Sequence, residues 1–346
     1  MTAASTGGRS PPSTRLRRAE DRDSRYASVR DCSFTLGALI GLHLSEEVRT
    51  ATSWRLAPLG RSAPELHVFS RLDGWVTSEQ RALGVAGYRS SARLVSGSSA
   101  SRQGQLGADG EPFDTSSRSV RTGHHLEIST PALLARLADQ CCEQWTSMDS
   151  GIWEPGEIGH HTISRIGCWD ALDRAVDPAE CGQLPVERAT AGATKPLFRR
   201  FVEERCWSAK GRAYSFYAGT DELDAAVVLA GQTGVEHGAR RALTIEAVIR
   251  ELRDGPCIDR DRAMSAEEGA LVACSFWVVD VLIFTGQLDR TGVRMDQAVG
   301  LRSGPSGCSQ ARSRPALARC SATRPGPLAP HTEQCRPRPV PGDGLA

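Results

Sequence analysis

The chain has 346 residues, of which 40% are hydrophobic, so it is long enough to bury a sizeable core in one or two domains. Its formal net charge of +1 excludes an overall basic field, and nucleic acid is therefore not an expected partner. The arginines near the amino terminus precede no apolar run of the secretory kind, so we expect a cytoplasmic protein.

Composition divides the chain into three parts. Residues 1–23 lack apolar periodicity, which predicts a disordered segment because little apolar surface is present to offset the entropy of ordering. Residues 24–301 contain recurrent helical patterns and form one predicted helical domain. Residues 302–346 hold eight of the nineteen prolines, which predicts a disordered tail that cannot sustain helices.

Three segments of the middle part have helical character. Apolar residues of 168–175 recur at i, i+3, i+4 and i+7, and so do those of 245–252, between a predicted Thr244 cap and Gly255 at the carboxyl-terminal end. The run 270–284 is apolar almost all round, which predicts a buried inner helix rather than a membrane span. Strand-like alternation is scarce, so we predict an all-α protein, although the segment 55–130 shows no clear elements.

The histidine and cysteine patterns favour neither a metal nor a cofactor. The adjacent pairs His124-His125 and His160-His161 lack a third ligand at characteristic spacing, and adjacent histidines point in different directions on regular structure. No two of the eleven cysteines have the Cys-x-x-Cys spacing of a zinc or redox site. We expect reduced, structural cysteines and no bound cofactor.

The segment 149–157 places a carboxyl group beside a tryptophan, at a turn before a predicted helix. Trp153 offers a flat apolar face on which a sugar ring can stack, and such a face raises the pKa of a neighbouring carboxyl, as a general acid requires. Glu154 is therefore the candidate proton donor to a glycosidic oxygen. The alternative is a core tryptophan beside a solvated glutamate.

Five segments, 30–36, 149–157, 168–175, 219–225 and 267–277, occur in an order and at separations that resemble glycoside hydrolase family 15. This is the family of glucoamylases and bacterial trehalases, and the resemblance covers about residues 24–301. It implies a catalytic domain with an (α/α)6 toroid, incomplete at its last helices in this chain, and an inverting mechanism.

The resemblance also implies roles for single residues. Arg30 and Asp31 match a pair that hydrogen-bonds the hydroxyls of the terminal glucosyl unit, whereas without the resemblance they read as a surface ion pair. Trp153 matches the stacking tryptophan and Glu154 the general acid. Arg260 matches a further sugar-binding arginine, in a loop that is shortened here.

Other charged residues have simpler explanations. Asp221, Asp224 and Glu268 stand at predicted helix starts, where carboxylates cap helices more often than they bind ligands. The alternating run 259–262 is typical of a solvated surface.

Four positions depart from the family pattern. Ser28 replaces a tryptophan that usually precedes the Arg-Asp pair by two residues, which removes one wall of the sugar pocket. Ser98, Gly107 and Asp109 stand where the family tends to have Asn, Asp and Tyr. We therefore expect weaker sugar binding.

The general base has no candidate. An inverting hydrolase needs a second carboxylate to activate water, and in the family this is a glutamate shortly before the last barrel helix. The resemblance ends near Leu301, and Glu333 and Asp343 have no surrounding motif; a frameshift would explain such a tail. Without the closing helix, Trp277 and Phe284 should be exposed to solvent. We expect little or no hydrolase activity from the chain as written.

The sequence predicts a hydrolase of α-glucosidic bonds whose substrate is an α-glucoside, either trehalose or a maltooligosaccharide, with no membrane partner. An inactive remnant that binds sugar or nothing is the alternative. A toroid of the isoprenoid cyclase kind ranks lower, because the sequence has no Asp-rich metal cluster. The oligomeric state stays open.

Overall fold

The computed structural model describes residues 21–22, 26–62, 67–75, 80–85, 94–97, 103–121, 123, 125–128, 130–153, 158–184, 188–235, 238–262 and 272–300. Helices dominate this part of the chain, which confirms the all-α class. The α-helices are α1 (Val29–Gly41), α2 (Ser45–Ser62), α3 (Glu111–Arg121), α4 (Thr130–Gln144), α5 (Thr162–Arg174), α6 (Val176–Glu180), α7 (Arg188–Arg205), α8 (Ala239–Glu251), α9 (Val272–Phe284) and α10 (Leu288–Gly300). Two 3-10 helices, η3 (Leu106–Gly110) and η4 (Ala225–Gln232), complete the helical elements of the described residues.

The strands are two or three residues long and form small ribbons between helices. They are β1 (Asp21–Arg22), β2 (Ala27–Ser28), β3 (Phe69–Ser70), β4 (Arg81–Ala82), β5 (Leu94–Ser96), β6 (Trp207–Ser208), β7 (Ala213–Tyr214), β8 (Arg253–Asp254) and β9 (Cys257–Ile258). β5 pairs with β1 in parallel and with β4 in antiparallel register, while β2–β3, β6–β7 and β8–β9 are antiparallel pairs. The segment 55–130, which the sequence did not resolve, thus contains the end of α2, three short strands, η3 and α3.

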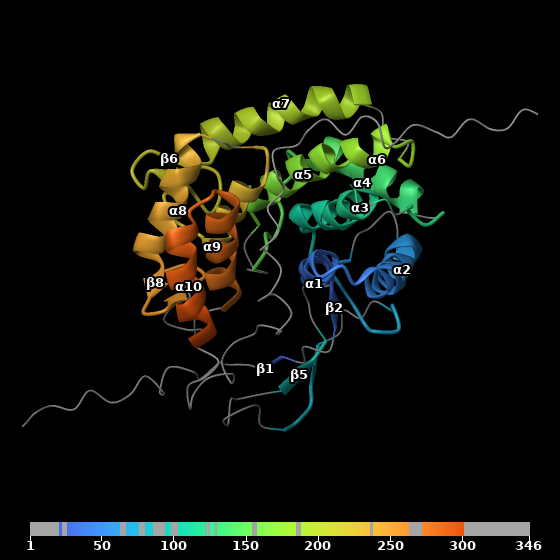
Figure 1. Ribbon diagram of the computed structural model, residues 1–346, viewed down its shortest axis with the longest axis horizontal. Coiled ribbons are helices and arrows are strands. Elements are labelled where there is room, and N and C mark those ends of the chain that lie inside the picture. The colour runs from blue at the N-terminus through green and yellow to red at the C-terminus, as the bar shows by residue number, and fades with distance from the viewer. Residues whose placement is uncertain are drawn as a thin grey trace, which may run out of the picture.

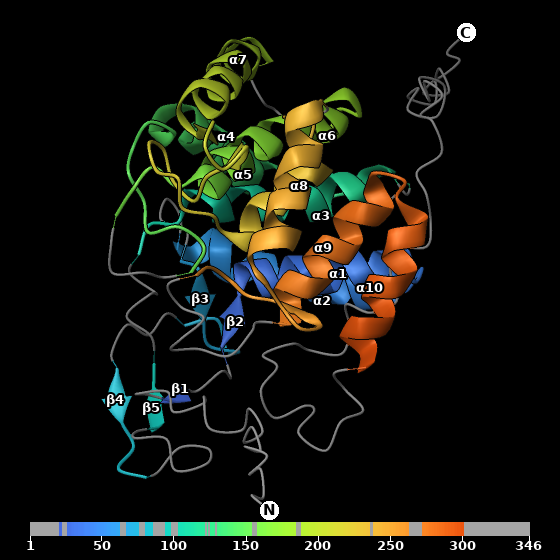
Figure 2. The same ribbon diagram turned by 90° about the vertical axis from the view of Figure 1, so that its left-hand side faces the viewer.

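The helices form an inner and an outer layer (Figures 1 and 2). Along the inner layer α1 packs on α3, α3 on α5, α5 on η4 and η4 on α9. Outside it, α2 packs on α1, α4 and α7 on α5, α8 on η4 and α10 on α9. Inner and outer elements alternate along the chain, which is the arrangement expected of an α/α toroid.

Two of the predicted helices differ from the observed ones mainly at their ends. The 168–175 pattern lies in α5, which begins earlier, at Thr162. The 245–252 pattern lies in α8, whose N-cap is Gly238, so the predicted Thr244 cap is wrong. Thr244 instead sits inside the helix, where its hydroxyl donates to the Arg240 carbonyl and accepts from the Tyr214 backbone. Gly255 turns the β8–β9 hairpin with a φ of +59° and does not end the helix.

The third predicted helix, 270–284, corresponds to α9, which is buried along most of its length in the main hydrophobic core. The expectation that both Trp277 and Phe284 would be exposed is only half right. Trp277 is 5% exposed because it packs on the rings of Trp153 and Phe34, whereas Phe284 at the end of the helix is 50% exposed. Core contacts from distant segments therefore bury the tryptophan.

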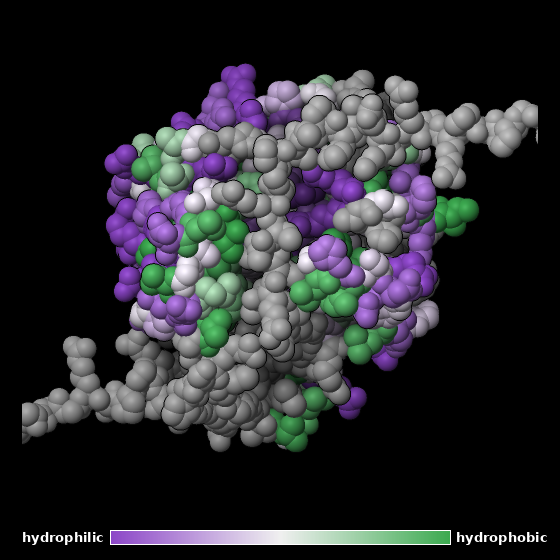
Figure 3. Space-filling model, viewed as in Figure 1, coloured by the Kyte–Doolittle hydropathy of each residue, from purple (hydrophilic) through white to green (hydrophobic). Residues whose placement is uncertain are grey.

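Apolar side chains also reach the surface. Figure 3 shows green patches over the α9–α10 side and over the α1–α2 side of one face. Phe284, Leu288 and Val293 contribute exposed apolar surface on α9 and α10. None of the helices in the described ranges has the length and apolar character that crossing a bilayer requires.

Candidate active site

The loop that carries Trp153 is pinned at both ends. Asp149 and Gly159 exchange two backbone hydrogen bonds of 2.9 Å, which brings the ends of the loop together. Three residues after Gly159, at Thr162, α5 begins. The loop is therefore anchored to the amino-terminal end of an inner helix.

A buried ion pair supports this anchor. The Asp149 carboxylate accepts from Arg165 (2.8 Å) and from the Ser164 hydroxyl (2.6 Å), both on the first turn of α5. The backbone N–H groups of Leu106 and Gly151 lie 3.3 Å from the same carboxylate. Both charged side chains are essentially inaccessible to water, so each depends on the other for compensation.

Gly151 allows the loop to lie directly on an imidazole ring. Its φ of +63° is in the left-handed region, and a Cβ at this position would lie 2.7 Å from Cγ of His161. Any side chain here would be strained and would also clash with the ring. The glycine therefore sets the path of the chain two residues before Trp153.

Trp153 is held by three elements that are distant in sequence. Its indole Nε1–H donates to the Asp224 carboxylate at 2.8 Å. The guanidinium of Arg260 lies over its ring, 5.4 Å from the ring centroid, and the ring of Trp277 lies 5.6 Å away. Trp153 is thus fixed by a hydrogen bond, a cation–π contact and a ring contact.

Arg260 and Asp261 do not lie on a solvated face, so that prediction is wrong for these two residues of the run 259–262. Their side chains are 17% and 12% exposed and form an ion pair of 2.8 Å. The backbone of this segment pairs with the start of η4, since Ala225 N–H donates to the Arg260 carbonyl. This pairing places Arg260 and Asp261 beside η4 and the Trp153 loop.

Asp224 is the predicted cap and also the partner of Trp153. As N-cap of η4 it accepts from the Ala226 N–H at 2.9 Å, through the same Oδ1 that accepts from the indole. Burial raises the pKa of the Asp224 carboxyl to about 7, although these two hydrogen bonds act in the opposite direction. Asp221, another predicted cap, accepts instead from the Ser208 hydroxyl.

Arg30 lies on the first turn of α1 and pairs with Glu111, not with Asp31. The distance from Nε to Oε1 is 3.3 Å, and the two side chains are 15% and 20% exposed, so this is not an exposed surface pair. Asp31 is exposed, and its N–H donates to the hydroxyl of Ser28, the N-cap of α1. Ser28, which departs from the family pattern, therefore caps the amino-terminal end of α1.

A chain of aromatic rings joins the Arg30 helix to the Trp153 loop. Phe34, one turn after Arg30 on α1, has its ring centroid 5.9 Å from that of Trp277, which in turn contacts Trp153. Residues four apart lie on the same helix face. Arg30 is therefore on the face of α1 that is directed towards the aromatic cluster.

Charged side chains from three inner helices surround Glu111. Burial raises the pKa of the Glu111 carboxyl to about 7, and Asp114 and Asp170 add to this effect, while Arg30 opposes it. Arg174 pairs with both Asp114 and Asp170. Burial alone would raise the pKa of Asp114, but the cations Arg174 and Arg118 hold it below its ordinary value.

Several predicted residues lie outside the described ranges. They are Glu154, Ser98, Glu268, and Glu333 and Asp343 of the segment 301–346. The backbone of Asp109 is described within η3 and its side chain is not. The structure therefore places Trp153, Asp224 and Arg260 together, with Arg30 joined to them through the rings of Phe34 and Trp277.

The pair His160-His161 has structural surroundings, while His124 of the other pair lies outside the described residues. His160 Nδ1 is 2.9 Å from Arg165, and burial, with the nearby cation, lowers its pKa. His161 packs beneath Gly151. In the described part of the chain, no three His, Cys, Asp or Glu side chains gather in a group that could hold a metal ion.

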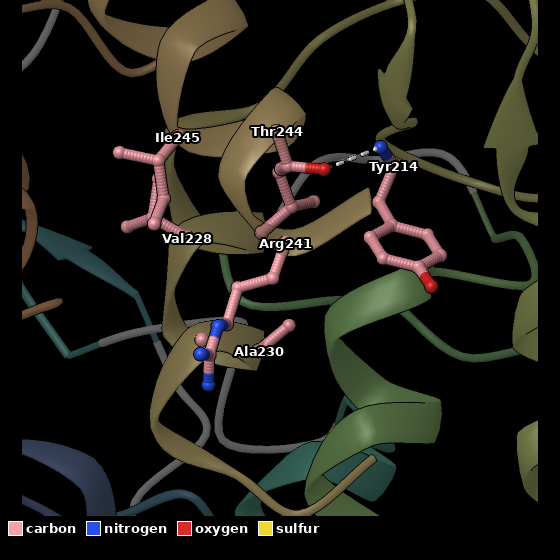
Figure 4. A pocket seen from close by; sticks show the side chains of 8 residues that line it. Tyr214, Val228, Ala230, Arg241, Thr244 and Ile245 are labelled. Atoms are coloured by element: carbon pink, nitrogen blue, oxygen red, sulfur yellow. Dashed lines mark hydrogen bonds between the residues drawn. The ribbon is translucent and has the colours of Figure 1, made fainter. Parts of the chain in front are cut away.

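A small pocket lies apart from this cluster, between η4 and α8 (Figure 4). The Tyr214 N–H donates to the Thr244 hydroxyl at 3.1 Å beside it, and Arg241 lines it together with apolar residues of η4. Its cavity volume is about 10 Å³, which is room for about one water molecule. It does not accommodate a sugar ring.

Residues 1–254 match the family described as Glycosyl hydrolases family 15. The chain belongs to glycoside hydrolase family 15. It is 28% identical over 286 residues to a trehalase of Mycolicibacterium smegmatis and 27% identical to a trehalase of Mycobacterium tuberculosis. These matches cover 78% of this chain but only 42% and 41% of the two trehalases, so the chain spans about two fifths of their length.

Solved structures share the fold. A wild-type glycosidase has a TM-score of 0.64 at 17% identity, covering 78% of this chain and 73% of its own. A glycosidase variant in complex with glucose has a TM-score of 0.65 at 16% identity, covering 82% and 76%. A glucoamylase from Saccharomycopsis fibuligera has a TM-score of 0.55 at 13% identity, covering 78% and 65%. The fold is the all-α (α/α)6 type of family 15.

Sequence reasoning missed three contacts of this family 15 chain. It treated Asp224 as a cap alone, gave Glu111 no role, and did not pair Asp149 with Arg165. Asp149 and Asp224 stand inside motifs that carry the family resemblance, which was a signal for both. The partners themselves lie 16 to 81 positions away in the chain, where no spacing rule reaches.

Proposed function

We propose that residues 24–301 form a domain that binds a terminal α-glucosyl unit and acts on α-glucosidic bonds, of trehalose or of maltooligosaccharides. Trp153 stacks on the sugar, Arg30 and Asp31 hydrogen-bond its hydroxyls, and Arg260 supports the same pocket. Glu154 is the general acid of an inverting reaction. Membership of family 15 and the trehalase relatives support this proposal.

The observation that carries the proposal is the fixed orientation of Trp153. A stacking platform needs a ring whose plane does not move, and this ring is held by Asp224, Arg260 and Trp277. Glu154 follows it directly, and consecutive Cα atoms lie about 3.8 Å apart.

A second candidate is sugar binding without turnover. The sequence after Leu301 provides no motif around Glu333 or Asp343 that matches the family's base. General acid catalysis alone supplies about 10² to 10⁴ in rate, a small part of what glycoside hydrolysis requires. In this case glucosyl ligands bind and the bond is not cleaved.

The test combines a binding and a turnover measurement on the purified full chain. Tryptophan fluorescence titrated with glucose and trehalose measures affinity, and glucose release from trehalose and maltose measures turnover. We expect Trp153→Ala to weaken binding by about tenfold or more, because stacking is lost. Trp75→Ala, which removes an exposed tryptophan outside the cluster, should leave affinity unchanged.

The turnover arm decides between the two candidates. Glucose release that disappears in Glu154→Gln supports hydrolysis with Glu154 as the acid. Binding without any release supports the second candidate. Equal affinity in the Trp153→Ala and Trp75→Ala variants would refute the proposed sugar site.

A further inference from the structure

Asp224 combines two features that a helix cap does not need. It is wholly buried, and its Oδ1 accepts from both Ala226 N–H and Trp153 Nε1–H. Its other oxygen, Oδ2, is also buried and has no hydrogen-bond partner among the residues that the structure describes. A neutral serine, threonine or asparagine would cap η4 without burying a carboxyl group.

Burying the Asp224 carboxyl is energetically unfavourable, so we expect an interaction that only a carboxyl at this position provides. A buried polar atom without a hydrogen-bond partner destabilises the folded state, because its lost contact with water is not replaced. Two charged side chains act on Asp224: Asp261 raises its pKa and Arg260 lowers it. Asp224 in turn raises the pKa of the buried Cys274 thiol. None of them bonds to Oδ2. The carboxyl supplies a hydrogen-bond acceptor for the indole, and the bond from Ala226 N–H fixes this acceptor to the backbone of η4.

The position of that acceptor determines the orientation of the indole. Arg260 and Trp277 contact the ring of Trp153 through non-directional or broadly directional forces. The Nε1–H···Oδ1 bond is directional, so it defines the rotation of the ring in its own plane and about its side-chain bonds.

We propose that Asp224 is a positioning residue for glucosyl recognition: it orients the Trp153 indole, and through it the sugar platform, by the hydrogen bond to Nε1. This inference rests on the proposed function. Asp224 does not touch the sugar, and its effect on affinity passes through Trp153 alone.

The experiment is a double-mutant cycle on the full chain, with the dissociation constant for trehalose and glucose as the readout. We expect Asp224→Ala to weaken binding by about five- to tenfold, the usual worth of one oriented hydrogen bond. Asp224→Asn retains an acceptor oxygen at Oδ1 and should bind within about twofold of the unmodified chain. In the Trp153→Phe background, which lacks the indole N–H, Asp224→Ala should cause no further loss.

Asp221→Ala is the matched control, because Asp221 bonds to Ser208 near the same segment. It should leave affinity unchanged. Thermal unfolding of each variant verifies that it is folded at the assay temperature, and if Asp224→Ala does not fold, Asp224→Asn and Asp224→Thr in both backgrounds replace it. The threonine hydroxyl can still cap η4, but the side chain is too short to accept the hydrogen bond from the Trp153 indole.

The outcomes separate the two proposals. Equal losses from Asp224→Ala in the unmodified chain and in the Trp153→Phe background mean that Asp224 acts on the fold and not through the indole, and overturn the inference. The same holds if all Asp224 variants bind as well as the unmodified chain. If the unmodified chain binds neither sugar, the proposed function fails and the inference fails with it.

Discussion

At the residue scale, two carboxyl groups are fully or largely shielded from water, and both have a pKa raised to about 7. Glu111 lies against Arg30, and Asp224 lies against Trp153. In each case burial is the main cause of the raised pKa. Both groups therefore change protonation near neutral pH and not at the acidic pH typical of exposed carboxyls.

The raised pKa of Asp224 predicts how stability depends on pH. In the unfolded chain the group returns to its ordinary value of 3.8, so between about pH 4 and pH 7 the folded state binds more protons than the unfolded state. Stability contributed by this group is therefore fully present below about pH 4 and is lost as pH rises through about 7, by up to about 1.4 kcal/mol for each pH unit.

Replacing Asp224 by Asn removes this titration. We expect the free energy of unfolding of Asp224→Asn, relative to the unmodified chain, to rise from pH 4 to pH 7 and then to level off. Urea unfolding at four or five pH values measures it. Two curves that stay parallel across this range would show that Asp224 titrates at its ordinary value.

At the element scale, the Trp153 loop owes its position to the start of α5. The buried Asp149–Arg165 pair and the backbone exchange between Asp149 and Gly159 tie the loop to the helix. α5 itself runs very close to η3, since a Cβ on Gly167 would lie 2.8 Å from Cα of Gly107. Gly107, which departs from the family pattern, is therefore part of a tight backbone crossing.

Breaking the buried pair should loosen the loop. Arg165→Ala leaves the Asp149 carboxylate buried without its counter-ion, which costs about 3 to 5 kcal/mol of unfolding free energy. Arg200→Ala, which removes an exposed partner of Glu204 on α7, should change stability by less than about 0.5 kcal/mol. Urea denaturation compares the two variants, and a similar small loss in both would contradict the anchoring role of the pair.

At the scale of the whole molecule, the site depends on contacts between the first described helix, α1, and α9 near the other end of the described chain. Trp277 of α9 lies between Phe34 of α1 and Trp153 of the loop. The loss of this one side chain therefore affects three segments that are far apart in the chain. Its burial shows that α9 belongs to the inner layer.

Trp277→Ala should accordingly be among the more destabilising substitutions in the core. Removing a buried tryptophan costs about 3 to 5 kcal/mol, and the cavity should also free one side of Trp153 and weaken sugar binding. Phe284→Ala, near the exposed end of the same helix, is the control and should cost much less. Calorimetry and the fluorescence titration measure the two effects, and equal stability of both variants would contradict the proposed role of Trp277.

The spacing of apolar residues in the sequence predicted those helices that face the core in the same way along their whole length. The patterns of α5 and α8 were visible because core contacts repeat every three or four residues, whereas α9 was visible as an almost continuous apolar run. Helix ends were less certain, as Thr244 shows, because a capping residue can also lie inside a helix and bond to a neighbouring strand. The alternating charges at 259–262 predicted a solvated surface, but Arg260 and Asp261 are largely buried. Alternation of charge carries no information about which other segment packs on the run.

The sequence by itself determined the all-α class, the family and the candidate residues of the site, because helical periodicity and ordered motifs are local properties of the chain. Only the tertiary structure decided the partners of those residues. Asp224 meets Trp153 across 71 positions and Glu111 meets Arg30 across 81, so that one carboxyl is fully buried and the other is largely shielded, each beside a specific donor. Burial and long-range contact raise their pKa values, and neither can be read from neighbours along the chain.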